Sequence, residues 1–255
     1  MRLFLVCAAA AILIGCGGKF ADVAKYAGNF GEKAPSEAQM IEALKTALTD
    51  GAADAAAKLS QSGGYDKSAL YRIPLPPEAD TIVKNAKLIS GGERLIDDTI
   101  TRINAAAETA AKEAAPIFAK AIADMTITDA IGILKGGDSA ATDYLRRQTS
   151  GALKAAFAPK LDAALAKPIV AGVSAQTAWN TLTSGYNKAA NSIAGKLAKL
   201  EPVKTSINDY ALDKALAALF NEAAIAEAKV RADPLSSGKA IVQKVFEYAK
   251  NTLNK

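Results

Sequence analysis

The sequence contains no histidine, and its two cysteines, Cys7 and Cys16, both lie close to the N-terminus. Histidine is the usual general base near neutral pH and the commonest protein ligand of transition metals. Its absence argues against most acid-base and metal-dependent chemistry. We therefore expect no catalytic residue, no metal site and no cofactor, and we do not expect the protein to be an enzyme.

Aromatic residues are scarce as well, at 6% of the chain, although 50% of the 255 residues are hydrophobic. The core must then be built mainly from alanine, leucine, isoleucine and valine. Alanine favours helices, and no stretch shows the alternation that is typical of a strand. The composition predicts an all-α fold, a single bundle-like domain of about eight helices over residues 36–255 with no significant sheet.

The N-terminus has the pattern of a secretory signal peptide. Arg2 supplies a basic residue, and an uncharged apolar stretch, residues 3–14, follows it. This stretch is too short for a membrane-spanning helix. It ends in Leu13-Ile14-Gly15-Cys16, which resembles the lipobox of bacterial lipoproteins, where the cysteine receives lipid. The alternative is an ordinary signal peptide that contains a cysteine by chance.

Lipidation of Cys16 would divide the first part of the chain in two. Residues 1–15 would be a lipoprotein signal peptide, and residues 16–35 a lipidated N-terminus and flexible tether. The mature chain would then have no free thiol, because Cys7 leaves with the signal peptide. Gly17 stands where an aspartate would favour the inner membrane, so we expect a cell-envelope protein on the outer membrane, facing the periplasm.

The chain is mildly basic, with a formal net charge of +5 and an isoelectric point near 9.0. A protein anchored in the cell envelope meets anionic lipids and wall polymers rather than nucleic acid. We expect membrane contact through the lipid anchor, with an envelope protein or a lipid as possible further partner and no nucleic acid. The sequence leaves the oligomeric state open.

Periodic apolar residues predict the helices of the domain. The first follows a capping box formed by Ser36 and Gln39. Residues 71–77 contain three prolines and predict an extended strap with Ile73 and Leu75 facing the core. The strap could instead dock a partner. Further helices are expected over approximately residues 78–89, 95–115, 117–125, 127–135, 138–158, 161–168, 174–197, 206–233 and 241–246.

Two prolines and one stripe of bulky residues lead to more specific expectations. Pro116 should kink or restart the helix that reaches it, and Pro159 should lie near the end of its helix. A stripe of bulky residues in the helix that opens at Ser174 is expected to face the core. The stripe consists of Trp179, Leu182, Tyr186, Ile193 and Leu197.

One compact segment gathers polar residues around two predicted helix starts, where an arginine and helix N-termini could bind an anion. The structural alternative is that the threonine and the aspartates are helix caps, the tyrosine is half-buried and the arginine is solvated. Other acidic residues, such as Glu108, are expected on a solvated face. The candidate residues are Thr126, Asp129, Asp138, Thr142, Tyr144 and Arg146.

Several segments together resemble an uncharacterised family of bacterial lipoproteins, catalogued as domain of unknown function 4197. The most specific are Ile73-Pro74-Leu75-Pro76 and Ala140-Ala141-Thr142 with Tyr144, supported by Pro116-Ile117-Phe118 and by Asp233-Pro234. The similarity runs from about Ser36 to Phe246. It departs from the family at Ala105 and at Ser236-Ser237, where the family tends to carry basic residues. The resemblance implies an all-helical periplasmic lipoprotein and no particular substrate.

We therefore expect a periplasm-facing lipoprotein that acts as a non-catalytic binding or structural module. Two alternatives remain open. The protein could carry an acyl chain or another apolar ligand between its alanine-lined helices, which would require an apolar cavity. It could also be a hydrolase of the cell envelope, which would require a carboxylate pair or a serine–lysine pair in a cleft.

Overall fold

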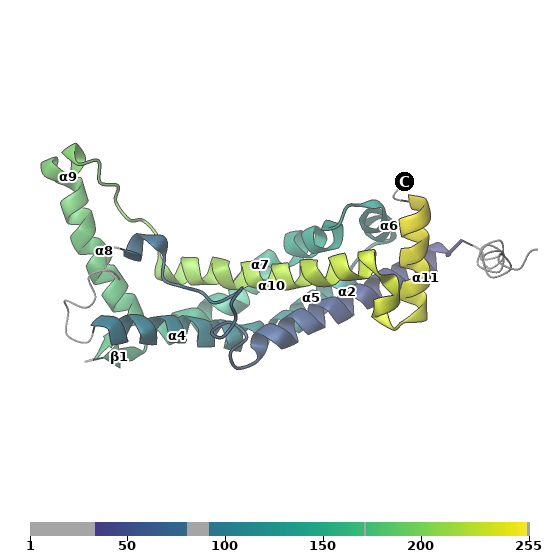
Figure 1. Cartoon of the computed structure of the whole chain (residues 1–255), viewed down its shortest axis with the longest axis horizontal. Coiled ribbons are helices and arrows are strands. Elements are labelled where there is room, and N and C mark those ends of the chain that lie inside the picture. Colours follow the sequence, from purple (N-terminus) through teal and green to yellow (C-terminus); the bar gives the residue numbers. More distant parts are fainter. Residues whose placement is uncertain (1–33, 81–91, 171, 254–255) are drawn as a thin grey trace, which may run out of the picture. The chain divides into compact units, whose positions relative to one another are not determined.

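The computed structural model describes residues 34–80, 92–170 and 172–253. The chain separates into two units, Met1–Pro35 and Ser36–Lys255. The expected signal peptide and almost all of the expected tether lie outside the described residues, and so does Cys16. The second unit is all-helical, as the sequence predicts. Figure 1 shows its elements, and the fold is described for this unit alone.

The helical elements that the structure describes in this unit range in length from a single turn to 27 residues. Their order is α2 (Glu37–Ser60), η1 (Pro77–Ala79), α4 (Gly92–Ala111), α5 (Ala114–Ala123), α6 (Ile127–Lys135), α7 (Ala140–Ala166), α8 (Ala175–Asn191), α9 (Ile193–Leu197), α10 (Ile207–Ala232), η3 (Pro234–Ser237), α11 (Ala240–Tyr248) and η4 (Ala249–Leu253). Between α7 and α8, β1 (Pro168–Val170) and β2 (Val173–Ser174) form a small antiparallel ribbon. Its few residues leave the all-α class unchanged.

The core lies where α7 packs against α10 and α4, with α2 and α5 completing it. Helix α7 buries a stripe in which each side chain follows the previous one by four residues, so that successive members lie on neighbouring parts of the helix surface and the stripe winds gradually around the helix. Alanines at the matching positions of α10, such as Ala211, Ala215 and Ala218, are buried as well. Their small side chains allow the helix backbones to approach closely. The stripe of α7 is Leu145, Thr149, Leu153, Phe157, Leu161 and Leu165.

Helix α7 corrects the prediction made for Pro159. The helix does not end near this proline, and no separate piece begins at Leu161, because α7 continues to Ala166. An internal proline leaves the carbonyl four residues earlier, here that of Ala155, without its helical donor. Pro159 and Ala155 are both exposed, so water can bind this carbonyl. Phe157 and Leu161 are fully buried on the other face, and their packing outweighs the local loss.

Pro116 restarts a helix, as predicted. Helix α4 ends at Ala111, and α5 begins at Ala114 with Pro116 in its first turn, where a missing N–H costs nothing. The predicted strap is also confirmed. Ile73 is buried and Leu75 packs partly against the core. The helix expected over residues 78–89 falls mostly outside the described residues, and its described beginning is the single turn η1.

The bulky stripe after Ser174 differs from the prediction. Trp179 is buried, but Leu182 and Tyr186 are each 38% exposed, and Ile193 and Leu197 are each 81% exposed. For Ile193 and Leu197 the reason is a break in the helix at Ser192, which caps the separate short helix α9. The residues of the stripe therefore do not all belong to one continuous helix. Ile193 and Leu197 lie on the separate helix α9 and face away from the core.

Candidate functional site

Two of the six predicted site residues form a helix cap. The Thr126 hydroxyl accepts a hydrogen bond from the Asp129 N–H at 3.2 Å, and Asp129 Oδ2 accepts from the Thr126 hydroxyl and N–H at 2.7 and 3.1 Å. This is the capping box that begins α6. These bonds stabilise the ionised carboxylate, so the pKa of Asp129 lies below its ordinary value. Both residues have a structural role here.

The other four residues do not join them in a single pocket. Tyr144 is buried and its hydroxyl donates to the Ala121 carbonyl at 3.4 Å; burial raises its pKa, and the Asp129 carboxylate adds to the effect. Asp138 is exposed in the turn between α6 and α7. Arg146 is exposed and lies 4.6 Å from the centre of the Phe220 ring. Thr142 is buried and bonds to a residue that sequence reasoning missed.

That residue is Glu227 of α10, whose carboxylate receives five hydrogen bonds. The N–H groups of Ala141 and Thr142 donate at 2.9 and 2.8 Å, and the Thr142 hydroxyl donates at 2.8 Å. Arg231, one turn later on α10, donates from Nε at 2.9 Å and from Nη2 at 2.8 Å. A carboxylate at the N-terminus of α7 also interacts favourably with the helix dipole.

Glu227 thereby caps α7, which is the role that the structural alternative gave to Asp138. Ser139 occupies the N-cap position of α7, but its side chain makes no capping hydrogen bond. Instead the Ser139 hydroxyl donates to Asp143. Arg231 completes the arrangement on the other side of the turn, where it donates to the Ile133 carbonyl at the end of α6 at 2.9 Å. One buried ion pair thus holds both sides of the α6–α7 turn.

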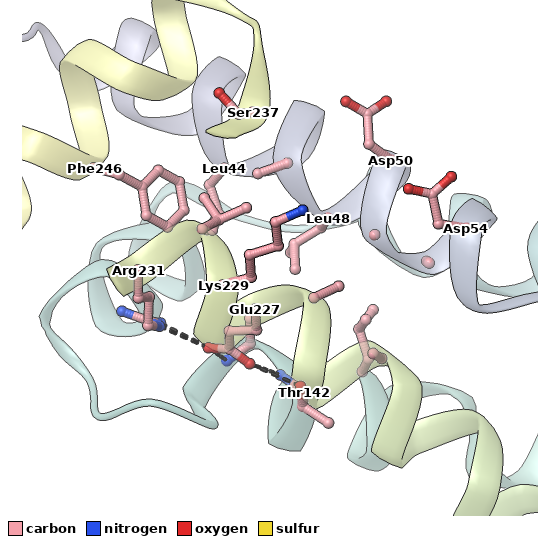
Figure 2. A pocket seen from close by; sticks show the side chains of 18 of the residues that line it. Leu44, Leu48, Asp50, Asp54, Thr142, Glu227, Lys229, Arg231, Ser237 and Phe246 are labelled. Atoms are coloured by element: carbon pink, nitrogen blue, oxygen red, sulfur yellow. Dashed lines mark hydrogen bonds and ion pairs between the residues drawn. The ribbon is translucent and has the colours of Figure 1, made fainter. Parts of the chain in front are cut away.

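A cavity of about 340 Å³ opens beside this ion pair, between α2, α10 and the elements after α10. Figure 2 shows Glu227 between Arg231 and Thr142, with Asp50 and Asp54 on a separate helix and Leu44, Leu48 and Phe246 lining the apolar side. The Glu227 carboxylate is buried and has its hydrogen-bonding capacity filled. It is therefore not available as a general base. Two further carboxylates line the cavity, Asp50 and Asp54, and Asp50 is paired with Lys239 at 2.6 Å.

Glu108 was expected on a solvated face, and the structure places it differently. Its side chain accepts hydrogen bonds from the N–H groups of Gly63, Tyr65 and Asp66 at 3.0, 3.2 and 3.2 Å. It therefore anchors the loop after α2 to α4. In the described part of the chain, no serine hydroxyl is hydrogen bonded to a lysine amine, which is the pairing that a serine–lysine mechanism requires.

The second notable cavity is an apolar groove, also of about 340 Å³, between the strap, α4, α8 and the start of α10. Its lining is almost entirely carbon, with threonines at 99, 177 and 181 as the polar residues. Trp179 is fixed in the wall because its indole N–H donates to the Thr205 carbonyl at 2.9 Å. The groove is lined by Leu75, Ala79, Leu95, Ile96, Thr99, Val173, Ala175, Thr177, Ala178, Trp179, Thr181, Leu182 and Ile207.

Two further features bear on the class of site. Within the described ranges, no group of three or more acidic or thiol side chains is placed to hold a metal ion. In the same ranges, no helix is both long and apolar enough to cross a membrane.

Comparison with known proteins identifies the family of the chain. No curated protein and no solved structure matches it. The family described as "Protein of unknown function (DUF4197)" matches residues 34–247, which is nearly all of the helical unit and includes the strap, the Glu227–Arg231 pair and the apolar groove. Because this match covers well over half of the sequence, the chain belongs to the DUF4197 family.

Proposed function

We propose that the protein is a lipid-anchored, non-catalytic binding module of the bacterial cell envelope, and that it holds an apolar ligand, such as an acyl chain, in the groove beside Trp179. The observation that carries the proposal is the lining of this groove. It combines a volume typical of small-molecule sites with a wall that offers carbon atoms and few polar groups. The sequence left two alternatives open, a carrier and a hydrolase, and the lining of the groove favours the carrier.

The buried acidic groups support a binding role over a hydrolytic one. Glu227 is saturated by amide, hydroxyl and guanidinium donors. Glu222, also buried, is paired with Lys58 at 2.6 Å. A general acid or base must be able to exchange a proton with the substrate, and these carboxylates are committed to structural contacts. Among the described residues that line the apolar groove, none carries a carboxylate or an amine.

The proposal about location rests on the sequence alone, namely the apolar stretch before Leu13-Ile14-Gly15-Cys16. We place the mature protein on the periplasmic face of the outer membrane, held by lipid on Cys16. Growth with radiolabelled palmitate should label the wild-type protein in membranes, and Cys16→Ser should abolish the label. A protein that stays unlabelled and soluble in the periplasm would contradict this part of the proposal. It would not affect the proposal that the groove binds an apolar ligand.

The groove can be tested by fluorescence because Trp179 is the single tryptophan of the sequence and lies in its wall. A dansylated C11 fatty acid bound in the groove should receive energy from Trp179, and palmitate should displace it. Residues 17–255, which lack the lipid anchor, should show saturable transfer. If no transfer occurs, or if palmitate does not compete, the groove does not bind acyl chains.

A matched pair of variants on α8 separates binding in the groove from adsorption elsewhere. Ala178→Phe adds a ring inside the groove and should lower the affinity at least about tenfold by filling the space. Asn180→Phe adds the same ring two residues away at an exposed position outside the groove and should leave the affinity unchanged. Equal effects of the two substitutions would overturn the assignment.

A further inference from the structure

The connection between α8 and α10 exposes more large aliphatic surface than any other described part of the fold. Ile193 and Leu197 are each 81% exposed, and Leu200 is 39% exposed. Ile193 and Leu197 are separated by four residues in α9, so their side chains lie on the same face of that helix. Figure 1 shows α9 at the far end of α8 from the α7–α10 core. We call residues 192–200 the α9 tip.

The α9 tip has a defined conformation. Ser192 caps its start, where the Gly195 N–H donates to the Ser192 hydroxyl at 3.0 Å. Its end is closed by two hydrogen bonds, from Leu200 N–H to the Gly195 carbonyl at 3.0 Å and from Lys199 N–H to the Lys196 carbonyl at 3.1 Å. This is the pattern of a Schellman motif. The exposed aliphatic residues are therefore held outward by a closed turn of backbone.

The left-handed residue of this motif is Lys199, with a φ of 55°. Glycine is the usual residue at such a position, because a side chain there is strained. The tip carries a lysine instead. Its neighbourhood is basic as a whole: between residues 186 and 204 there are four lysines, Lys188, Lys196, Lys199 and Lys204, all exposed, and the single acidic residue is Glu201.

We infer that the α9 tip docks on the surface of an anionic lipid bilayer, with Ile193 and Leu197 entering the interface and the lysines contacting phosphate groups. A bilayer interface accepts aliphatic side chains and attracts the cations that surround them, so it matches both properties of the tip. The contact is made by the folded domain itself and does not depend on the lipid at Cys16 or on the groove beside Trp179.

The inference can be tested with residues 17–255, which lack the lipid anchor. We expect them to sediment with vesicles that contain 30% phosphatidylglycerol and to stay in solution with vesicles of pure phosphatidylcholine. Raising the salt concentration from 0.05 to 0.5 M should weaken binding, because the lysine contribution is screened. If the protein ignores anionic vesicles at low salt, the inference is wrong.

Variants locate the contact on the tip. Ile193→Ser with Leu197→Ser should lower the partition coefficient about tenfold or more, because two exposed aliphatic side chains no longer enter the interface. Leu235→Ser, at a residue that is 63% exposed outside the tip, is the matched control and should bind as wild type. Ala178→Phe should also bind as wild type, so that failure of the groove proposal leaves this result unaffected.

The variant Lys199→Gly distinguishes an effect on vesicle binding from an effect on stability. Glycine relieves the strained backbone at φ 55°, so thermal stability should be kept or raised while vesicle binding falls several-fold. Light scattering in solution tests the alternative that the α9 tip contacts a second copy of the chain. The inference would be overturned if the wild type forms dimers and does not bind vesicles, and if the double serine variant is monomeric. The tip would then be a self-association surface.

Discussion

Asn104 of α4 pairs with both backbone polar groups of Ile73 in the strap. Asn104 Oδ1 accepts from the Ile73 N–H at 2.8 Å, and its Nδ2 donates to the Ile73 carbonyl at 2.9 Å. Nδ2 also donates to the Ile100 carbonyl at 2.7 Å. Both Asn104 and Ile73 are buried. The amide side chain therefore acts as the partner strand that this extended segment lacks, and it fixes the strap against the core.

Replacing this amide should be costly. Asn104→Leu keeps the approximate size but leaves the N–H and carbonyl of Ile73 buried without partners, which should lower the free energy of unfolding by about 2–4 kcal/mol. Urea denaturation measures the change. Thr109→Ala, at an exposed threonine of the same helix, should change stability by less than about 0.5 kcal/mol. Equal stabilities of the two variants would contradict the role given to Asn104.

The buried ion pair of α10 gives a second prediction. Glu227→Leu removes the carboxylate that caps α7 and leaves the Arg231 guanidinium, whose side chain is only 9% exposed, without its carboxylate partner, so it should destabilise the fold by about 3–5 kcal/mol. Adding Arg231→Met should recover part of this loss, since the unpaired charge is then gone. Glu247→Leu at an exposed position of α11 is the control. A double variant less stable than Glu227→Leu would contradict the claim that the unpaired charge of Arg231 causes part of the loss.

Two buried tyrosines predict sensitivity to alkali. Burial raises the pKa of Tyr71 to about 12, with a further contribution from the hydrogen bond to Glu222, and burial raises the pKa of Tyr65 as well. Tyrosine in the unfolded chain loses its proton near pH 10. Above that pH the unfolded state binds fewer protons than the folded state, so the free energy of unfolding should fall with rising pH.

The slope should be roughly 1 kcal/mol per pH unit for each tyrosine that stays protonated in the folded state. Urea denaturation between pH 9 and 11.5 measures it. Tyr71→Phe should make the decline shallower, although it also removes the hydrogen bond that Asn221 donates to the Tyr71 hydroxyl. A wild-type stability that is constant across this range would contradict the prediction.

Two glycines of the α8–α9 region should respond to alanine in opposite ways. A Cβ at Gly195 would lie 2.2 Å from the Ala189 carbonyl oxygen and 2.6 Å from that of Ala190, so Gly195→Ala must open the corner between the helices. A Cβ at Gly185 would meet nothing within 4 Å. Gly185→Ala should raise the free energy of unfolding by about 0.5–1 kcal/mol, because alanine favours a helix interior. Thermal melts that fall for Gly195→Ala and rise for Gly185→Ala would confirm this.

Local motifs allowed much of the fold to be predicted from the sequence. The capping box at Ser36 was predicted correctly because it is complete within four residues, and the cap formed by Thr126 and Asp129, given as the alternative to ligand binding, is equally local. The position at which α7 starts was predicted, but its capping partner was not, because that partner is Glu227, 85 residues away from Thr142. The exposure of Ile193 and Leu197 was missed for a related reason, since a serine cap ended the helix inside the apolar period.

The candidate site shows the same division. The sequence placed Thr126 and Asp129 together correctly, and the structure gives them the capping role that was the alternative to ligand binding. It could not show that Thr142 turns toward α10 or that Arg146 lies against Phe220, since both contacts depend on how distant helices pack. The apolar groove has no local signal either, because its wall is assembled from segments between residues 75 and 207.

The late position of Glu227 in the chain has a consequence for biogenesis. A polypeptide is synthesised from its N-terminus, so α6, the following turn and α7 emerge well before the carboxylate and guanidinium that secure them. Until α10 arrives, the first amides of α7 lack their partner. A nascent or proteolysed chain that stops short of residue 227 should leave this corner open to proteases, which makes the C-terminal quarter of the chain a checkpoint for completing the fold.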